Sequence, residues 1–240
     1  MIIEDRSVFD LPSRTCTSVE KYGVDPDNFI EIFEPASQSL GQVVLIHGGS
    51  WRIEYDLAHL RSYAGALSDA GYRVHLVEYR RTPGFPDNYS DDIRKAIEHC
   101  GGGVLIGHSA GGHLALIAPD ATNSRLIKGI IALSPLCDLA TADKDNTDSG
   151  AVRDFLGTAA VNRPDLDPNV RLNEHVPVLI IHGVDDLIVP IEHSRNLYNS
   201  YVKAGLDCEL IELEKIGHFE PIDYRKAPFE IVLAQLKKLA

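Results

Sequence analysis

Short apolar runs alternate with longer amphipathic stretches from about residue 42 to the end of the chain. The short runs are continuously apolar, which is typical of parallel strands that are buried on both faces. The longer stretches repeat apolar residues three or four positions apart, as on one face of a helix. Strands are expected over 42–46, 73–77, 103–106, 127–133, 176–181 and 208–213, and helices over 56–70, 91–99, 113–118, 191–204 and 222–239. This order predicts an α/β fold with a mainly parallel central sheet and helices on both of its faces.

The segments outside this alternation are less regular. Residues 1–27 are mixed, with a candidate short strand over 15–19 and a turn at 25–28, and residues 29–33 alternate as an edge strand would. Ser90 is expected to cap the helix over 91–99. Residues 136–175 are polar and irregular except for a short helix near 150–156, and we interpret them as a small cap or insertion. Without a repeat or a linker, residues 1–240 are interpreted as a single domain.

The charge and the composition narrow the class of protein. The formal net charge is −12, and this disfavours nucleic acid and anionic membrane surfaces as partners. No apolar run approaches the roughly 20 residues of a membrane span, and the N-terminus does not resemble a signal peptide. We therefore expect a cytoplasmic protein, although the charge does not identify a substrate.

The four cysteines, at positions 16, 100, 137 and 208, are far apart and form no Cys-x-x-Cys pair. This spacing offers neither a zinc site nor a disulfide framework, so they are interpreted as free thiols. The scattered histidines also lack metal-ligand spacing, and we expect no metal and no cofactor.

One motif stands at the centre of the candidate chemistry. Residues 107–111 read Gly-His-Ser-Ala-Gly, between an expected strand and an expected helix. A serine on such a sharp strand-to-helix turn is held in a strained conformation with its hydroxyl clear of the sheet. Side chains two positions before and after it would collide with neighbouring backbone, which explains Gly107 and Gly111. The alternative is a plain glycine-rich turn, so the motif needs support from elsewhere in the chain.

That support comes from other strand ends. In open parallel sheets, ligands bind beyond the carboxyl ends of the strands. Residues 47–49 read His-Gly-Gly after one strand, Asp185 and Asp186 follow another, and His218 follows the last. Ser109 needs a base to become a nucleophile, and His218 is the candidate base. One of the two aspartates would orient His218 and offset its positive charge.

An oxyanion needs backbone N–H donors in addition. Ala110, directly after the serine, is expected to supply one, and Gly48 or Gly49 the other. Trp51, His108 and Phe219 flank these motifs and are the candidates for substrate contact. Trp51 fits a core position equally well, and His108 fits a role in shaping the turn.

Together these motifs resemble the α/β-hydrolase superfamily from about residue 28 to the end. Its third motif usually reads His-Gly-x-x-Asp-x-x-Val-Pro, and residues 182–190 match it, which implies Asp186 as the catalytic acid. The His-Gly-Gly-x-Trp sequence at 47–51 and the late His218-Phe219 look like the small carboxylesterase and kynurenine formamidase (arylformamidase) branch. The oxyanion loop lacks the third glycine of the lipase-like pattern.

The resemblance implies a serine hydrolase that cleaves a small ester or an N-formyl-type amide through an acyl-enzyme on Ser109. The short segment 136–175 favours a small cap and small acyl substrates. An acyltransferase with the same triad and a non-catalytic binding protein on the hydrolase scaffold are the alternatives. Neither the natural substrate nor the oligomeric state follows from the sequence.

Overall fold

The computed structural model describes residues 3–121 and 124–239. Eight strands form one sheet in the order β1-β2-β4-β3-β5-β6-β7-β8. The pairs from β4 across to β8 are parallel, and β1 and β2 add antiparallel pairs at one side. The strands are β1 (Ser18–Lys21), β2 (Phe29–Phe33), β3 (Gln42–Ile46), β4 (Arg73–Val77), β5 (Gly103–His108), β6 (Ile127–Leu133), β7 (Val178–Gly183) and β8 (Cys208–Leu213). This is the mainly parallel sheet of the α/β fold that the sequence predicts.

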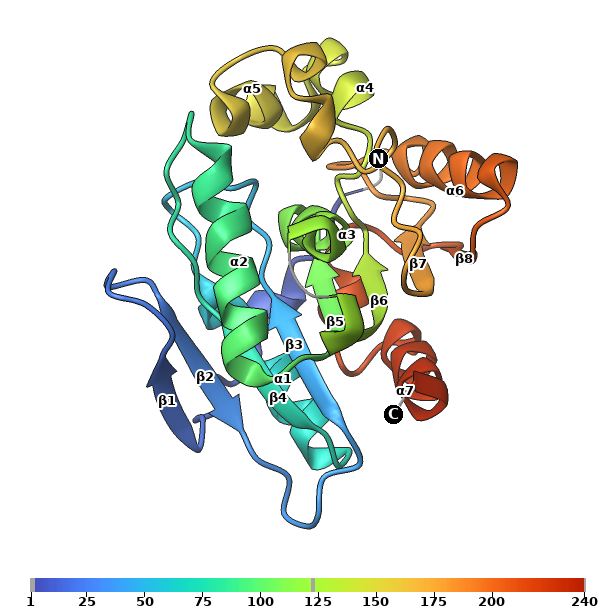
Figure 1. Cartoon of the computed structure of the whole chain (residues 1–240). Coiled ribbons are helices and arrows are strands. Elements are labelled where there is room, and N and C mark those ends of the chain that lie inside the picture. The colour runs from blue at the N-terminus through green and yellow to red at the C-terminus, as the bar shows by residue number, and fades with distance from the viewer. Residues whose placement is uncertain (1–2, 122–123, 240) are drawn as a thin grey trace.

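The helices cover both faces of the sheet (Figure 1). On one face lie α2, α3 and α6, and on the other α1 and α7. Consecutive residues of the central strands pack on opposite faces: Val44 and Ile46 join the first core, and Val43 and Leu45 join the second. The main helices are α1 (Arg61–Asp69), α2 (Pro86–Cys100), α3 (Ala110–Ala121), α6 (Glu192–Ala204) and α7 (Ala227–Leu239). Burial on both faces explains why these strands are continuously apolar.

The segment between β6 and β7 forms a small helical layer over the carboxyl ends of the strands (Figure 1). It contains α4 (Leu139–Lys144), α5 (Ala151–Leu156) and several short 3₁₀ turns. Although the segment is polar overall, Phe155 and Val152 are buried in the core. Its helices therefore pack onto the sheet domain through a few apolar side chains.

Two sequence predictions were wrong in detail. Residues 29–33 were expected at an edge, but β2 lies between β1 and β4, and β1 is the edge. All residues of β1 are exposed, so it has no apolar pattern that would place it outside β2. The helix expected from residue 91 begins at Pro86, which places Ser90 inside α2 and not at its cap. Proline suits the first helical position, where no N–H donor is needed.

Smaller differences concern how helices begin. The helix expected over 56–70 starts as a 3₁₀ turn over Leu57–Leu60, where the Asp56 carboxylate accepts from the Ala58 N–H at 2.9 Å. The last helix begins at Ala227, after a separate 3₁₀ turn over Glu220–Ile222. Within the described residues, no helix is both long and apolar enough to cross a membrane.

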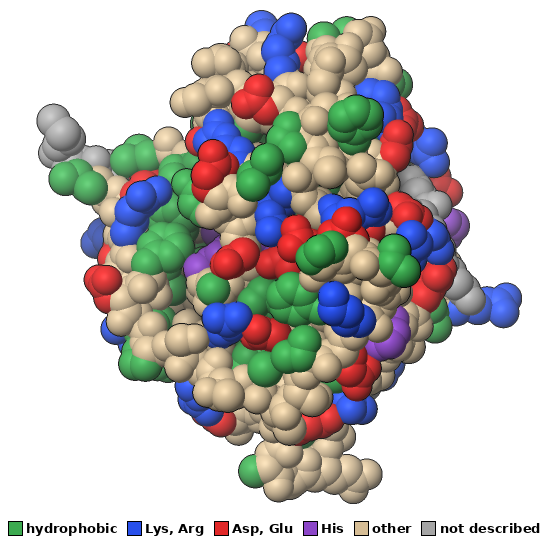
Figure 2. Space-filling view, turned by 90° about the vertical axis from the view of Figure 1, so that its left-hand side faces the viewer, with side chains coloured by type: hydrophobic (Ala, Val, Ile, Leu, Met, Phe, Trp, Pro, Cys, Tyr) green, Lys and Arg blue, Asp and Glu red, His purple; other side chains and the backbone are tan. Residues whose placement is uncertain are grey.

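Charges are mixed over the surface. On the face that Figure 2 shows, acidic and basic side chains are interspersed. The net charge of −12 is therefore not gathered into a single patch on this face.

Candidate active site

Ser109 stands at the turn between β5 and α3, with a left-handed φ of 55°. This conformation is costly for a residue with a side chain. It is held in place by backbone hydrogen bonds from the Ser109 N–H to Leu133 O (2.9 Å) and from the His113 N–H to Ser109 O (3.1 Å). The neighbouring strand and the following helix thus both fix the serine.

The glycines around Ser109 are required by close contacts, as the motif predicts. A Cβ on Gly107 would lie 2.2 Å from Gly111 O, and a Cβ on Gly111 would lie 2.2 Å from Ile46 O. Real Cβ atoms do not approach other atoms so closely, so larger residues would displace the turn. The pattern therefore reflects steric need at the serine, not a general preference for a loose turn.

The predicted acid and base meet at the carboxyl ends of β7 and β8. His218 Nδ1 lies 2.7 Å from Asp186 Oδ2, and both side chains are buried. Asp186 Oδ1 accepts from the backbone N–H groups of Ile188 (2.9 Å) and Val189 (2.8 Å). Although burial opposes ionisation, the charge of His218 and hydrogen bonds from His182 and His218 hold the pKa of Asp186 well below its usual value. An ionised Asp186 requires Nδ1 of His218 to be the donor, which leaves Nε2 as the atom that can accept a proton.

Ser109 and His218 line the same cavity, which has a volume of about 230 Å³. Asp185, the alternative acid, is partly exposed, and its backbone N–H donates to Ile216 O at 3.0 Å. The structure therefore pairs His218 with Asp186 and not with its neighbour in the sequence.

A second hydrogen-bonded Ser-His-Asp chain, Ser194–His182–Asp186, shares the same aspartate. His182 Nε2 lies 3.2 Å from Asp186 Oδ2 and 2.9 Å from Val189 O, and its Nδ1 lies 2.7 Å from Ser194 Oγ. Ser194 and His182 are completely buried, and neither lines the cavity that Ser109 lines. Ser109, at 4% exposed, reaches the cavity, whereas Ser194 has no exposed surface and lies outside it. We therefore interpret the contacts of Ser194 and His182 as a support for Asp186.

The loop after β3 lies directly against the serine. A Cβ on Gly48 would be 2.8 Å from His108 O and 3.1 Å from Ser109 Cβ. Gly49 has φ +115°, and a Cβ there would be 2.4 Å from Tyr55 Cβ. Gly48 thus lets this backbone pass beside Ser109, where Ala110 begins α3, and Gly49 lets it turn against Tyr55.

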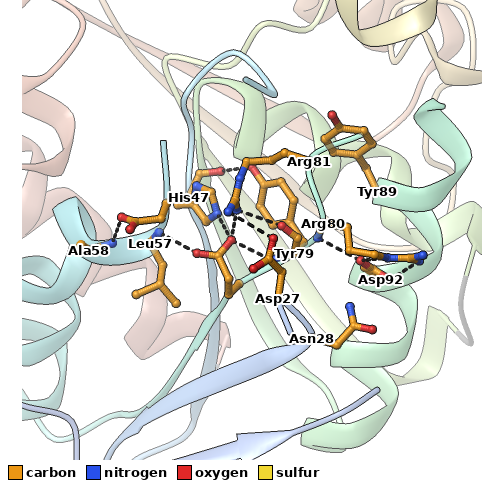
Figure 3. A network of polar contacts seen from close by, with 12 residues as sticks. Asp27, Asn28, His47, Leu57, Ala58, Tyr79, Arg80, Arg81, Tyr89 and Asp92 are labelled. Atoms are coloured by element: carbon orange, nitrogen blue, oxygen red, sulfur yellow. Dashed lines mark hydrogen bonds and ion pairs between the residues drawn. The ribbon is translucent and has the colours of Figure 1, made fainter. Parts of the chain in front are cut away.

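A buried ionic network fixes the start of this loop (Figure 3). His47 Nε2 lies 3.0 Å from Glu78 Oε1, and the Tyr79 hydroxyl donates to His47 O at 2.9 Å. Glu78 also contacts Arg81 and accepts from the Leu57 N–H at 3.0 Å. Burial opposes its ionisation, but the hydrogen bond and charge of His47 and the charge of Arg81 lower the pKa of Glu78 to about 2. Glu78 therefore ties the loop at 47–49 to two other parts of the chain.

The three candidates for substrate contact have different positions. His108 and Phe219 line the cavity. His108 Nε2 also donates to His218 O at 2.9 Å, and burial keeps the pKa of His108 well below its usual value. Trp51 is only 1% exposed and stacks on Phe155, with the ring centres 4.4 Å apart. It does not line the cavity, so it occupies the core position that the sequence offered as the alternative to substrate contact.

Several lining residues were not found from the sequence. Arg6 and Phe9 come from the N-terminal segment, and Asp148 comes from the layer over the sheet. Asp148 binds Ser50 and Arg52, which follow the loop at 47–49. These residues belong to no motif, and their contacts join distant parts of the chain. No local pattern in the sequence could therefore have placed them at the cavity.

Comparison with known proteins identifies the family of the chain. Residues 43–180 match a family described as the alpha/beta hydrolase family. The chain belongs to this family. Among curated relatives, an acetyl-hydrolase from Streptomyces hygroscopicus is 31% identical over 229 residues, with 82% of this chain and 76% of the relative covered. A kynurenine formamidase from Drosophila melanogaster is 23% identical over 234 residues, with 85% of this chain and 78% of the relative covered.

Solved structures share the fold of this hydrolase. A truncated carbohydrate esterase from gut microbiota has a TM-score of 0.78 at 20% identity and covers 94% of this chain and 97% of that one. A thermophilic esterase from the planctomycete Thermogutta terrifontis, with propionate bound, has a TM-score of 0.68 at 23% identity and covers 92% of both chains. These likenesses show that the chain has the α/β-hydrolase fold.

Proposed function

We propose that this protein is a serine hydrolase that cleaves small carboxylic esters or N-formyl-type amides through an acyl-enzyme on Ser109. One observation carries the proposal: Ser109, in its strained turn, lines the same cavity as His218, whose Nδ1 is held by Asp186. The competing serine, Ser194, lies outside that cavity and is completely buried.

The reaction follows from these positions. Nε2 of His218 takes the proton of the Ser109 hydroxyl as the oxygen attacks the substrate carbonyl. Asp186 keeps the imidazole in the correct tautomer and stabilises the imidazolium that forms. His218 then returns the proton to the leaving alcohol or amine, which leaves an acyl group on Ser109. Water, activated by His218, attacks this ester and releases the acid and free Ser109.

The negative oxygen of each tetrahedral intermediate needs donors. The N–H of Ala110, at the start of α3, and an N–H of Gly48 or Gly49 are the proposed pair. The close approach of Gly48 to Ser109 supports this assignment, because a Cβ at position 48 would touch the serine. Removal of one such donor typically lowers kcat by a factor of about 10²–10³.

The size of the cavity favours small acyl groups. Its volume of about 230 Å³ is below the usual range of pockets for drug-sized ligands. The curated relatives are named for acetyl and formyl chemistry, which is in keeping with a short acyl group.

A substrate panel tests this function. Purified protein is given p-nitrophenyl esters from acetate to decanoate and, separately, N-formylkynurenine. We expect turnover to peak at four carbons or fewer, or to favour the formyl amide, and the Ser109→Ala variant to lose nearly all turnover. Ser194→Ala is the matched control and should keep at least a tenth of it. Full turnover by Ser109→Ala, or a preference for long chains, would contradict the proposal.

A further inference from the structure

The N-terminal segment is fastened to the candidate active site. Glu4 Oε1 accepts from the Leu187 N–H at 2.6 Å, and Glu4 Oε2 accepts from the His218 N–H at 2.8 Å. Gly217 makes room for this carboxylate, because a Cβ there would lie 2.5 Å from Oε2. Asp5 pairs with Lys226 at 3.2 Å. Arg6 therefore follows Glu4, which is anchored beside the acid and the base, and Asp5, which is held by Lys226.

The guanidinium of Arg6 lies over aromatic rings at the cavity. Its Cζ is 5.1 Å from the ring centre of Phe219 and 6.0 Å from that of Phe9, and all three residues line the cavity. The two rings meet edge to face at 5.0 Å. Stacking of this kind orients the planar guanidinium but leaves its N–H donors in the plane available for a ligand.

No carboxylate among the described residues lies within ion-pair distance of Arg6. The acids near it have other partners: Glu4 holds two backbone N–H groups, and Asp148 binds Arg52. Arginines elsewhere meet carboxylates, as in the pairs Arg14–Asp69, Arg61–Glu31 and Arg225–Asp223. Arg6 is exposed, so in the free protein water meets its N–H donors and leaves them open to a ligand. Its position on the cavity wall points to a ligand as the missing partner.

We propose that Arg6 binds a carboxylate carried by the substrate, so that the preferred substrates are anionic esters or formamides. This inference rests on the proposed function, because it concerns the substrate of the same serine. The fork of N–H donors on a guanidinium matches both oxygens of a carboxylate. Arg52 also lines the cavity, but Asp148 offsets its charge. Because the protein's net charge of −12 repels anions in general, the unpaired Arg6 would decide where an anionic substrate is held.

Two pairs of esters test the proposal and locate the charge. The first pair is the mono-p-nitrophenyl ester of glutaric acid against p-nitrophenyl butyrate, with the carboxylate on the acyl side. The second is 3-carboxyphenyl butyrate against phenyl butyrate, with the carboxylate on the leaving group. The measured quantity is the ratio of kcat/KM for the anionic ester to that for the neutral ester.

The variants are Arg6→Gln, Arg6→Lys and, as a matched control, Arg94→Gln. Arg94 lies on α2 and pairs with Asp91 and Glu98. In at least one pair we expect the ratio to fall about tenfold in Arg6→Gln, to fall less in Arg6→Lys, and to stay within twofold in Arg94→Gln. The wild-type ratio in that pair should also fall as NaCl rises from about 0.05 to about 0.5 M, because salt screens an exposed charge.

The contrary outcomes are distinct. An unchanged ratio in both pairs for Arg6→Gln, or an equal fall in Arg94→Gln, would overturn the role of Arg6. The salt series on the wild type keeps the proposal testable even if Arg6→Gln is unstable, since a ratio independent of salt also contradicts it. Turnover of the neutral p-nitrophenyl butyrate tests the proposed function independently of Arg6. If this ester is cleaved but the ratios do not change, the proposed function stands and only this inference fails. If the wild type cleaves neither these esters nor N-formylkynurenine, the proposed function fails and the inference falls with it.

Discussion

At the scale of single residues, the backbone of Ser109 shows how the site departs from an ordinary fold. Its φ of 55° is favourable for glycine and costly for other residues. The surrounding strand and helix enforce it, because Gly107 and Gly111 allow the chain to pass at close range. The backbone of Ser109 is therefore strained, and in this conformation the residue lines the cavity.

This strain gives a stability prediction. Ser109→Gly and Ser109→Ala both remove the hydroxyl, but only glycine relieves the left-handed conformation. We expect Ser109→Gly to have a free energy of unfolding about 1 kcal/mol higher than Ser109→Ala, measured by urea denaturation. Equal stabilities would show that the turn is not strained. Both variants should lack esterase turnover.

The two adjacent aspartates provide a matched pair. Asp186→Asn would remove the charge that orients His218, and by analogy with other triads we expect kcat for p-nitrophenyl butyrate to fall about 10⁴-fold. Asp185→Asn should change kcat less than threefold, because Asp185 is partly exposed and does not contact His218. Comparable losses in the two variants would refute the assignment of the acid.

At the scale of elements, the parallel strands bring the motifs together. Residues 47–49, Ser109, Asp186 and His218 all follow strands of one sheet, and this common edge could be predicted from the alternation of apolar runs and helices. The N-terminal segment could not. Glu4 contacts residues 183 and 214 positions away, and nothing in its local sequence specifies that packing. The strand expected over 15–19 only partly overlaps β1 (Ser18–Lys21), because β1 is fully exposed and has no apolar pattern.

The N-terminal segment carries a prediction of its own. Glu4 joins the loop of the acid to the loop of the base, so we regard it as a positioning residue. Glu4→Gln keeps one acceptor oxygen and loses the charge, and we expect kcat for p-nitrophenyl butyrate to fall about tenfold, the equivalent of about 1.4 kcal/mol. KM should change less than threefold.

The control for Glu4 is Asp10→Asn, an exposed acid at the end of the same segment. An equal loss of kcat in both variants, or no loss in Glu4→Gln, would show that Glu4 does not position the base.

At the scale of the whole molecule, the core on each face of the sheet could be predicted from apolar periodicity, but the buried ionic network could not. His47, Glu78 and Arg81 come from two different strand ends, and their charges compensate one another only in the folded chain. The network holds the loop at 47–49 in place (Figure 3) and couples the site to overall stability.

This coupling predicts a dependence of stability on pH. The pKa of Glu78 is about 2 in the folded protein, against a reference of 4.5. Ionisation of Glu78 therefore stabilises the fold fully above about pH 4.5, and this contribution is lost as the pH falls towards 2. At pH 7 we expect Glu78→Gln to lower the free energy of unfolding by about 3–5 kcal/mol, since it leaves a buried charge without its partner. The difference from wild type should shrink as the pH falls from about 4.5 to about 3.

Urea denaturation at a series of pH values measures this difference. Glu98→Gln is the control, because Glu98 forms an exposed pair with Arg94 and such pairs contribute about 0–1 kcal/mol. A constant difference between wild type and Glu78→Gln over the whole pH range would show that Glu78 is not ionised in the network.

Covalent labelling of the wild-type protein with a fluorophosphonate, followed by mass spectrometry of its peptides, asks directly whether Ser109 is the nucleophile. We predict one label per chain, on Ser109, and no label after Ser109→Ala. A label on Ser194, or ester turnover by a protein that takes no label, would contradict the assignment of Ser109.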